Sequence, residues 1–488
     1  FDDVRLVAAP PSSIGKFGGD TDNWIWPRHT GDFSMFRVYA SKDNRPAAYS
    51  PQNVPYRPKK HFSISTKGVK EGDFTMIYGF PGNTQEYILS DAVAYIAERS
   101  DPAKIAVRTG RLDIITKAQE SDPALRIHYA AKHASIANAW KKWQGEALGI
   151  DRRGTVAAKF DYETQFGLWS VGRPEYAGVV MGLRAEYDRI MDAYFAYEIT
   201  RETLSTLPAA YTPEERAEEC FARRNFAEQA LWRHAFREYG RCPKVYRTPS
   251  YAEGMARYKS PEAYADALFE AVWEGSDSVA MQPAVRLREE TKRMLDHISW
   301  MLGTKSLRNL NSKILNELYT TYIKGLREWD RERAFYPDAN LTLRVAYGSV
   351  AGYEYADGEY HKPQTTLDGI IAKDNPEIYD YDIPQSLRDL YASKNYGRWG
   401  TVIDGRRTVP VCFLATNHTT GGNSGSPVLN AGGELIGINF DRTWRSTMSD
   451  IAYDPAICRN IAVDIRYVLF VVDRVGGAGY LLKEMTLK

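Results

Sequence analysis

Alternation of apolar and polar residues marks both ends of this chain. A period of two residues is typical of a β-strand with one buried face. Near the start, three segments have a strand-like pattern: residues 32–39, 61–65 and 73–78. After Pro337, four more segments are strand-like: residues 341–345, 408–414, 434–440 and 467–472. We therefore expect β structure at both ends, separated by a long stretch of another kind.

The long middle stretch has the three- and four-residue period of amphipathic helices. One predicted helix face carries six apolar residues at this spacing: Val180, Leu183, Tyr187, Ile190, Met191 and Tyr194. Thr212, Pro213 and Glu215 predict a capping box at the start of another helix. Ser260 and Pro261 predict a further helix start, because serine is a favoured N-cap and proline fits the first helical position.

The order of these patterns predicts a β domain interrupted by a helical insertion, because insertions are tolerated at surface sites of a domain. The length of 488 residues fits two to four domains. We expect residues 1–90 and 336–488 to form one β fold, and residues 91–335 to form a helical domain.

The composition excludes several classes of function. Lys and Arg number 63 against 62 Asp and Glu, and a net charge of +1 gives no drive toward nucleic acid or a membrane surface. No apolar run is long enough to span a bilayer. The four cysteines lack any metal-binding spacing, so we expect no metal site. Disulfides and buried thiols both stay open for these cysteines.

The first chemical motif is Thr-Gly-Gly-Asn-Ser-Gly-Ser-Pro-Val-Leu at residues 420–429. A serine between glycines on a tight turn suits a nucleophile, which also needs a base and donors for the oxyanion. We expect Ser424 to be the nucleophile. The N–H groups of Gly422 and Ser424 would converge on the substrate carbonyl oxygen. The alternative is a glycine-rich turn with a structural hydroxyl.

The second motif, residues 17–33, is dense in Gly, Asp, Trp and His, which no hydrophobic core requires. Loops of such composition usually bind a ligand. The alternative is structural: Asp20 and Asp22 would cap a turn against which the tryptophans pack.

The two motifs together resemble the S46 peptidase family, the bacterial dipeptidyl peptidases of types 7 and 11. The resemblance covers most of the chain and rests on four segments: residues 18–32, 79–82, 338–344 and 421–427. It implies a mainly β fold, a chymotrypsin-like double β-barrel, with an inserted helical cap domain. It also implies removal of dipeptides from the free N-terminus of peptide substrates, without a metal or organic cofactor. Family members are exported, usually to the periplasm of Gram-negative bacteria, and are commonly homodimers.

The resemblance also implies a catalytic triad in the chain order His, Asp, Ser, with Asp32 and Ser424 as the last two members. It assigns the oxyanion hole to the N–H groups of Gly422 and Ser424. The triad His should lie well upstream of Asp32, where this chain has none. His29 is too near to Asp32, and His418 has the wrong chain order. We therefore expect the chain to lack the start of its first barrel, including the base, and to have little acyl-transfer activity alone.

An exopeptidase must also bind the α-ammonium group of its substrate, which needs carboxylate and carbonyl acceptors. By resemblance, the positions that do so are Asn23, Trp24, Asn138 and Asp441. Arg442 then falls in the pocket for the penultimate side chain, where type 11 enzymes carry Arg and type 7 enzymes carry Gly. Because a guanidinium pairs with carboxylates, we expect release of Xaa-Asp and Xaa-Glu dipeptides.

Other functions remain open. A chain that never had the histidine would be a peptide-binding pseudoenzyme. A chain in which Arg442 does not line the pocket would be a type 7-like enzyme with an apolar preference. The aromatic content of 12% is also compatible with a carbohydrate-binding β protein.

Overall fold

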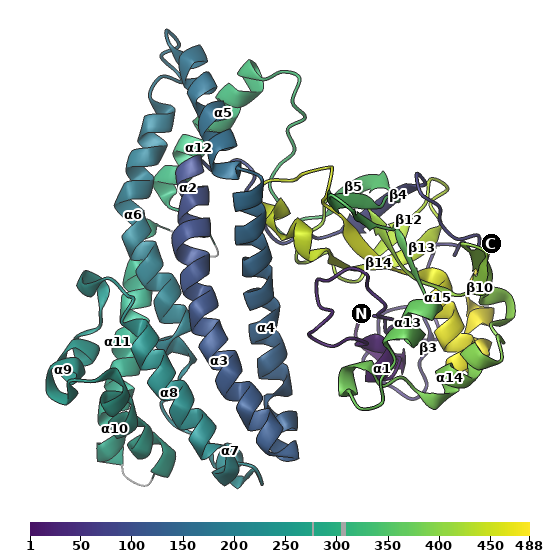
Figure 1. Ribbon diagram of the computed structural model, residues 1–488, viewed down its shortest axis with the longest axis horizontal. Coiled ribbons are helices and arrows are strands. Elements are labelled where there is room, and N and C mark those ends of the chain that lie inside the picture. The colour runs from purple at the N-terminus through teal and green to yellow at the C-terminus, as the bar shows by residue number, and fades with distance from the viewer. Residues whose placement is uncertain (276–277, 304–308) are drawn as a thin grey trace. The chain divides into compact units, whose positions relative to one another are not determined.

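Figure 1 shows a computed structural model of the protein, which describes residues 1–275, 278–303 and 309–488. The chain divides into two compact units. The first, which we call the β unit, joins Phe1–Glu86 to Asp338–Lys488. The second, which we call the helical unit, is Tyr87–Pro337. Helices hold more of the described residues than strands do, so the chain as a whole is α+β rather than mainly β.

The β unit is built on a seven-stranded sheet whose neighbouring strands are antiparallel. In spatial order its strands are β5 (Arg344–Ser349), β4 (Phe74–Gly79), β12 (Ser426–Leu429), β13 (Leu435–Arg442), β14 (Asn460–Asp464), β11 (Pro410–Ala415) and β8 (Gln364–Thr366). Ile77 on β4 pairs with Val428 on one side and Ala346 on the other. The first segment of the unit therefore lies inside the sheet made by the second.

Smaller elements complete the β unit. A three-stranded sheet consists of β1 (Asp3–Ala8), β2 (Met35–Ala40) and β3 (Val54–Pro55). Two hairpins are β6 (Tyr353–Ala356) with β7 (Glu359–His361), and β9 (Thr401–Ile403) with β10 (Arg406–Thr408). Its α-helices are α1 (Ser12–Gly15), α13 (Leu367–Lys373), α14 (Gln385–Ala392) and α15 (Ile465–Phe470).

The helical unit contains long helices around a large apolar core and a smaller one, the second formed where α3 and α4 lie side by side (Figure 1). Its α-helices are α2 (Ser90–Ala94), α3 (Asp101–Ser121), α4 (Pro123–Arg152), α5 (Thr155–Ser170), α6 (Val179–Glu202), α7 (Pro213–Ala217), α8 (Asn225–Tyr239), α9 (Pro249–Tyr258), α10 (Pro261–Glu274), α11 (Ser278–Leu302) and α12 (Lys313–Trp329). The face predicted from the three- and four-residue spacing lies on α6, where Leu183, Tyr187 and Ile190 are fully buried. Core packing of this kind, rather than intrinsic propensity, stabilises most protein helices.

The predicted helix starts are confirmed in the helical unit. Thr212 and Glu215 form the capping box of α7, in which each side chain accepts from the backbone N–H of the other. The side chain of Ser260 accepts a hydrogen bond from the N–H of Ala263 and so begins α10. At the other end of this helix, Gly275 adopts a positive φ of 64°, a conformation that glycine allows at little cost.

Three strand predictions were wrong in type or extent. Residues 467–472 continue the helix α15, which begins where the carboxylate of Asp464 accepts from the N–H of Arg466. Every residue of α15 is buried, and an apolar run without an exposed face does not distinguish a helix from a strand. The strand predicted at 341–345 begins only at Arg344, because Leu341 has a positive φ of 68°. Residues 61–65 form only isolated bridges at Ile64.

Two open questions about composition have structural answers. The four cysteines are all free thiols, and Cys242, Cys412 and Cys458 are buried. Among the described residues, none of the helices is both long enough and apolar enough to cross a lipid bilayer.

His29 is buried in the β unit without a partner for its Nδ1 atom among the described residues. Its ring lies against Gly369 of α13, where a Cβ atom would come within 1.9 Å of Nε2. Burial, followed by the charge of Lys373, lowers the pKa of His29 to about 3. The folded protein therefore holds this imidazole neutral, whereas the unfolded chain takes up a proton below about pH 6.5.

We expect His29 to make the protein less stable in acid. Between pH 7.5 and pH 5, this one group should lower the free energy of unfolding by about 2 kcal/mol, because only the unfolded state gains the proton. Urea denaturation of the wild type and of His29→Asn at both pH values measures the effect, which should be absent from the variant. His61 is exposed, so His61→Asn is a matched control that should keep the wild-type difference. An equal loss of stability in His29→Asn and the wild type would contradict the prediction.

Candidate active site

Ser424 lies on a turn that is held against strand β13. The N–H of Gly425 donates to the carbonyl of Asn439 at 2.8 Å, and the side-chain amide of Asn439 donates to the carbonyl of Asn423 at 3.1 Å. The hydroxyl of Ser424 is exposed and donates to the carbonyl of Phe440 at 3.1 Å. The serine is therefore presented to solvent on a turn whose backbone is fixed on both sides.

Glycines allow this turn to pack backbone to backbone against residues 79–82. The N–H of Gly82 donates to the carbonyl of Gly421 at 2.6 Å. Gly422 has a φ of 104°, and a Cβ atom there would lie 2.3 Å from the carbonyl oxygen of Phe80. Only glycine fits this position, because both the conformation and the space exclude a side chain.

Two amide groups of the turn are available to an oxyanion. Neither the N–H of Gly422 nor that of Ser424 donates to any residue in the described ranges. Fixed amide donors of this kind stabilise a developing negative charge without reorganising. The turn thus combines an exposed hydroxyl with two unused donors, which is the arrangement that acyl transfer needs.

Asp32 lies at the end of the loop 17–33 with its side chain exposed. Its carboxylate makes no hydrogen bond or ion pair with any residue that the structure describes. The protein around the carboxyl group displaces water and so raises the pKa of Asp32. The charge of Arg28 opposes this rise, and the charge of Asp441 adds to it. The hydroxyl of Ser424 also has no histidine partner in the described chain, so the structure does not join Asp32 and Ser424 into a triad.

The two histidines nearest in sequence to these residues have other contacts. His29 is buried against Gly369, as described above. His418 has its Nδ1 atom 3.2 Å from Glu86 Oε1 and its Nε2 atom 3.0 Å from the carbonyl of Ser449. Burial, followed by the charge of Arg442, lowers the pKa of His418.

Asp441 joins the loop to the end of β13. Its Oδ2 atom accepts from the N–H of Trp24 at 3.2 Å and from Nη1 of Arg28 at 2.8 Å. Its Oδ1 atom accepts from the N–H of Arg442 at 2.9 Å. Trp24 has a positive φ of 65°, which is uncommon for a residue with a side chain and is typical of functional sites. The structure therefore brings Trp24, next to Asn23, together with Asp441.

Asn138, the remaining predicted amine ligand, lies on α4 in the helical unit, with its side chain exposed. Arg28 is a site residue that the sequence did not identify as functional. The only indication in the sequence was that Arg28 lies within the motif 17–33. Its role follows from the structure, because a buried guanidinium requires a carboxylate partner.

Arg442 is buried, and both of its terminal nitrogens are hydrogen-bonded. Its Nη1 atom donates to Asp450 Oδ1 at 2.6 Å, and its Nη2 atom donates to Asp450 Oδ2 at 2.7 Å. Nη1 also donates to the hydroxyl of Ser449 at 2.8 Å and to the carbonyl of Thr419 at 3.2 Å. The guanidinium lies 5.8 Å from the ring centre of Trp24. The contact with Asp450 was not predictable, because Asp450 is the last residue of the short helix Trp444–Asp450, which turns the chain back.

One cluster in the helical unit has side chains of the metal-binding type. Donor atoms of His128, Glu218 and Cys220 all lie within 4.8 Å of one another. However, Nη1 of Arg224 donates to His128 Nε2 at 2.6 Å and lies 3.4 Å from Glu218 Oε2. A metal-bound histidine normally donates its other N–H to an acceptor, so a neighbouring guanidinium opposes metal binding here.

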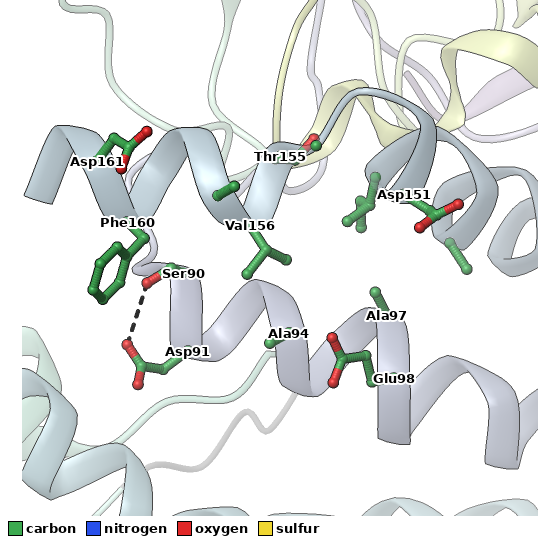
Figure 2. A pocket seen from close by; sticks show the side chains of 14 residues that line it. Ser90, Asp91, Ala94, Ala97, Glu98, Asp151, Thr155, Val156, Phe160 and Asp161 are labelled. Atoms are coloured by element: carbon green, nitrogen blue, oxygen red, sulfur yellow. Dashed lines mark hydrogen bonds between the residues drawn. The ribbon is translucent and has the colours of Figure 1, made fainter.

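A cavity of about 740 Å³ lies in the helical unit, between the helices α2 and α5 and the end of α4 (Figure 2). Ser90 and Asp91 line one side, and their side chains are 3.4 Å apart. Asp91 is paired with Arg184 at 3.1 Å, and the hydroxyl of Ser90 donates to Glu163 at 2.8 Å. The predicted site residues are not among those that line this cavity, and it contains no evident nucleophile with a base.

The comparisons with known proteins agree on one family. The model of the Peptidase S46 family matches residues 1–227 and 214–487. An Asp/Glu-specific dipeptidyl-peptidase of Capnocytophaga gingivalis is 42% identical over 100% of this chain and 73% of its own length. A dipeptidyl-peptidase 7 of Phocaeicola vulgatus is 35% identical over 100% of this chain and 72% of its own length.

The structural comparison gives the same result. The crystal structure of Porphyromonas endodontalis DPP11 in complex with the dipeptide Arg-Glu matches with a TM-score of 0.85 and 35% identity. The match covers 100% of this chain and 75% of that one. The chain belongs to the peptidase S46 family.

Proposed function

We propose that this protein is a serine dipeptidyl peptidase that releases N-terminal dipeptides with Asp or Glu at the penultimate position. The observation that carries the proposal is the buried guanidinium of Arg442, at the end of the strand that supports the Ser424 turn. A cation held beside the reacting serine selects a carboxylate and rejects apolar side chains, which would leave it without a substrate partner. Relatives named Asp/Glu-specific dipeptidyl-peptidases match over the whole chain.

The turn around Ser424 supports the acyl-transfer part of the proposal. Ser424 Oγ would attack the carbonyl carbon of the second residue, while the N–H groups of Gly422 and Ser424 donate hydrogen bonds to the carbonyl oxygen as it becomes negatively charged. The hydroxyl proton would pass to a histidine and then to the leaving amine. In the described ranges no histidine makes that contact, because the hydroxyl of Ser424 donates to the carbonyl of Phe440. Asp32 would orient the histidine and stabilise its charged form.

The loop 17–33 supports the exopeptidase part. Asp441, Asn23 and Trp24 would bind the free α-ammonium of the substrate. The role predicted for Asn138, on helix α4, stays a prediction. Arg28 already neutralises part of the charge on Asp441, so the ammonium would share that carboxylate rather than hold it alone. We further propose that the β unit is the peptidase body, a double β-barrel, and that the helical unit is its cap. Export to the periplasm and formation of a homodimer stay predictions.

The apolar preference of a type 7 enzyme is the weaker alternative. The relative named dipeptidyl-peptidase 7 matches at 35%, below the 42% of the Asp/Glu-specific relative. A peptide-binding pseudoenzyme is the second candidate function. It is favoured by one observation: the hydroxyl of Ser424 donates to the carbonyl of Phe440 instead of to a base.

Dipeptide binding and hydrolysis together test the proposal. Calorimetry should show that the protein binds Arg-Glu at least about 30-fold more tightly than Arg-Gln, whose second side chain has the same shape but no charge. Only the Glu carboxylate pairs with the guanidinium of Arg442. The native protein should also release Xaa-Asp from a peptide with a free N-terminus, and not from the acetylated peptide. Binding without hydrolysis would support the pseudoenzyme. Equal affinity for Arg-Glu and Arg-Gln would reject both versions of the acidic specificity.

We expect Arg442→Gly to change both specificity and stability. The preference for Arg-Glu over Arg-Gln should fall to within about 3-fold, because the cation is gone. The free energy of unfolding should fall by about 3 kcal/mol, because the carboxylate of Asp450 loses its bidentate partner in a mostly buried position. The double variant Arg442→Gly/Asp450→Asn should regain stability but not specificity. A variant that keeps the preference for Arg-Glu would show that Arg442 does not contact the substrate.

A further inference from the structure

The cation proposed to select the substrate is already neutralised before a substrate arrives. Both terminal nitrogens of Arg442 donate to the carboxylate of Asp450, at 2.6 and 2.7 Å. The side chain of Arg442 is only 4% exposed and that of Asp450 13% exposed. A pair with this geometry and burial is screened little by solvent, so its charges act on each other and on any third charge nearby.

The backbone at Asp450 is held by hydrogen bonds that do not involve the arginine. The backbone carbonyl of Asp450 accepts from the N–H of Gln85 at 2.6 Å. The next residue, Ile451, donates its N–H to the carbonyl of Met448 at 2.9 Å, which closes the turn around it. The backbone that carries the carboxylate is therefore held by contacts that do not involve the guanidinium.

A guanidinium has two edges that can pair with a carboxylate. Asp450 occupies the end formed by the two terminal nitrogens, and the side formed by Nε and one terminal nitrogen is the other forked edge. A substrate carboxylate that approaches this second edge is attracted by Arg442 and repelled by Asp450. The strength of acidic selection thus depends on the difference between two contacts of opposite sign.

We propose that Asp450 is a specificity-determining residue, which neutralises Arg442 in the empty site and so sets how strongly the site prefers an acidic over a neutral side chain. The inference rests on the proposed function. It has two consequences. When the pocket is empty, or holds a neutral side chain, Arg442 is still paired with Asp450. The free protein therefore avoids the energetic cost of an unpaired buried cation. The acidic preference is also smaller than an isolated arginine would give, which favours release of the charged dipeptide product.

The charged groups around the pair are consistent with this role. Ser449 and Thr419 contribute only a neutral hydroxyl and a carbonyl to Arg442. His418 lies next to the pair, and its lowered pKa keeps it uncharged at neutral pH. Among the hydrogen bonds described for the guanidinium of Arg442, only those with Asp450 go to a full negative charge, whereas the carboxylate of Asp441 accepts from the backbone N–H of Arg442.

The test compares the ratio of the Arg-Gln to the Arg-Glu dissociation constant in the wild type and in Asp450→Asn. We expect the ratio to rise about 10-fold or more in the variant, through tighter binding of Arg-Glu, with the affinity for Arg-Gln changed by less than about 3-fold. Asp450→Glu keeps the charge and should restore a ratio near that of the wild type. Asp450→Ser removes the charge with a smaller side chain, and replaces Asp450→Asn in the comparison if that variant does not fold.

Asp374→Asn is the matched control, because Asp374 also pairs bidentately with an arginine, Arg388, at 2.7 and 2.8 Å. It removes the same charge from the β unit, and the ratio should stay at the wild-type value. An unchanged or lower ratio in the uncharged Asp450 variants overturns the inference. A wild-type ratio near one is a different result, since it rejects the proposed function itself, whatever the variants do.

Discussion

The rest of the site depends on the hydrogen bonds that the carboxylate of Asp441 accepts. This carboxylate accepts hydrogen bonds from Arg28 and from the N–H groups of Trp24 and Arg442, and so links the loop 17–33 to the end of β13. Buried carboxylates are tolerated only when they are paired and hydrogen-bonded, and this one meets both conditions. The same contact holds Trp24 in its left-handed conformation and places its ring over Arg442. One side chain thereby positions the proposed amine site and the proposed acidic pocket together.

A second constraint joins the two separate segments of the β unit. Strand β4 and residues 79–82 come from the first segment, yet they support the Ser424 turn of the second through the backbone contact of Gly82 with Gly421. Asp338 links the two points at which the chain passes between the β unit and the helical unit. Its Oδ1 atom accepts from the hydroxyl of Thr84 at 2.6 Å and from the N–H of Glu86 at 2.9 Å. The long insertion therefore begins and ends at one fixed point of the β unit.

Much of this architecture could be predicted from local pattern, because amphipathic spacing and helix caps depend on residues close in sequence. The helix α6 and the caps at Thr212 and Ser260 were predicted for that reason. The error at 467–472 arose because a run buried on every side carries no periodic information. The division into a peptidase body and a cap, and the roles given to Ser424 and Asp32, stay predictions. Asp450 and Arg28 were not predicted, because their importance lies in contacts with residues distant in sequence or in the folded turn.

The distribution of charge distinguishes the three acidic residues of the site. Asp441 is paired with Arg28, and Asp450 with Arg442. Asp32 has no such partner in the described parts of the chain, although Arg28 is close enough to lower its pKa. Arg28 instead donates to Thr30 at 2.8 Å and to Asp441 at 2.8 Å, so its hydrogen bonds are directed away from Asp32.

A carboxylate with a raised pKa gains most from a nearby cation, which would restore its charged form. An imidazolium is such a cation, and a triad aspartate acts by stabilising it. Asp441 and Asp450 are therefore paired with arginines, which leaves Asp32 as the acid of the three that fits the predicted role beside a histidine.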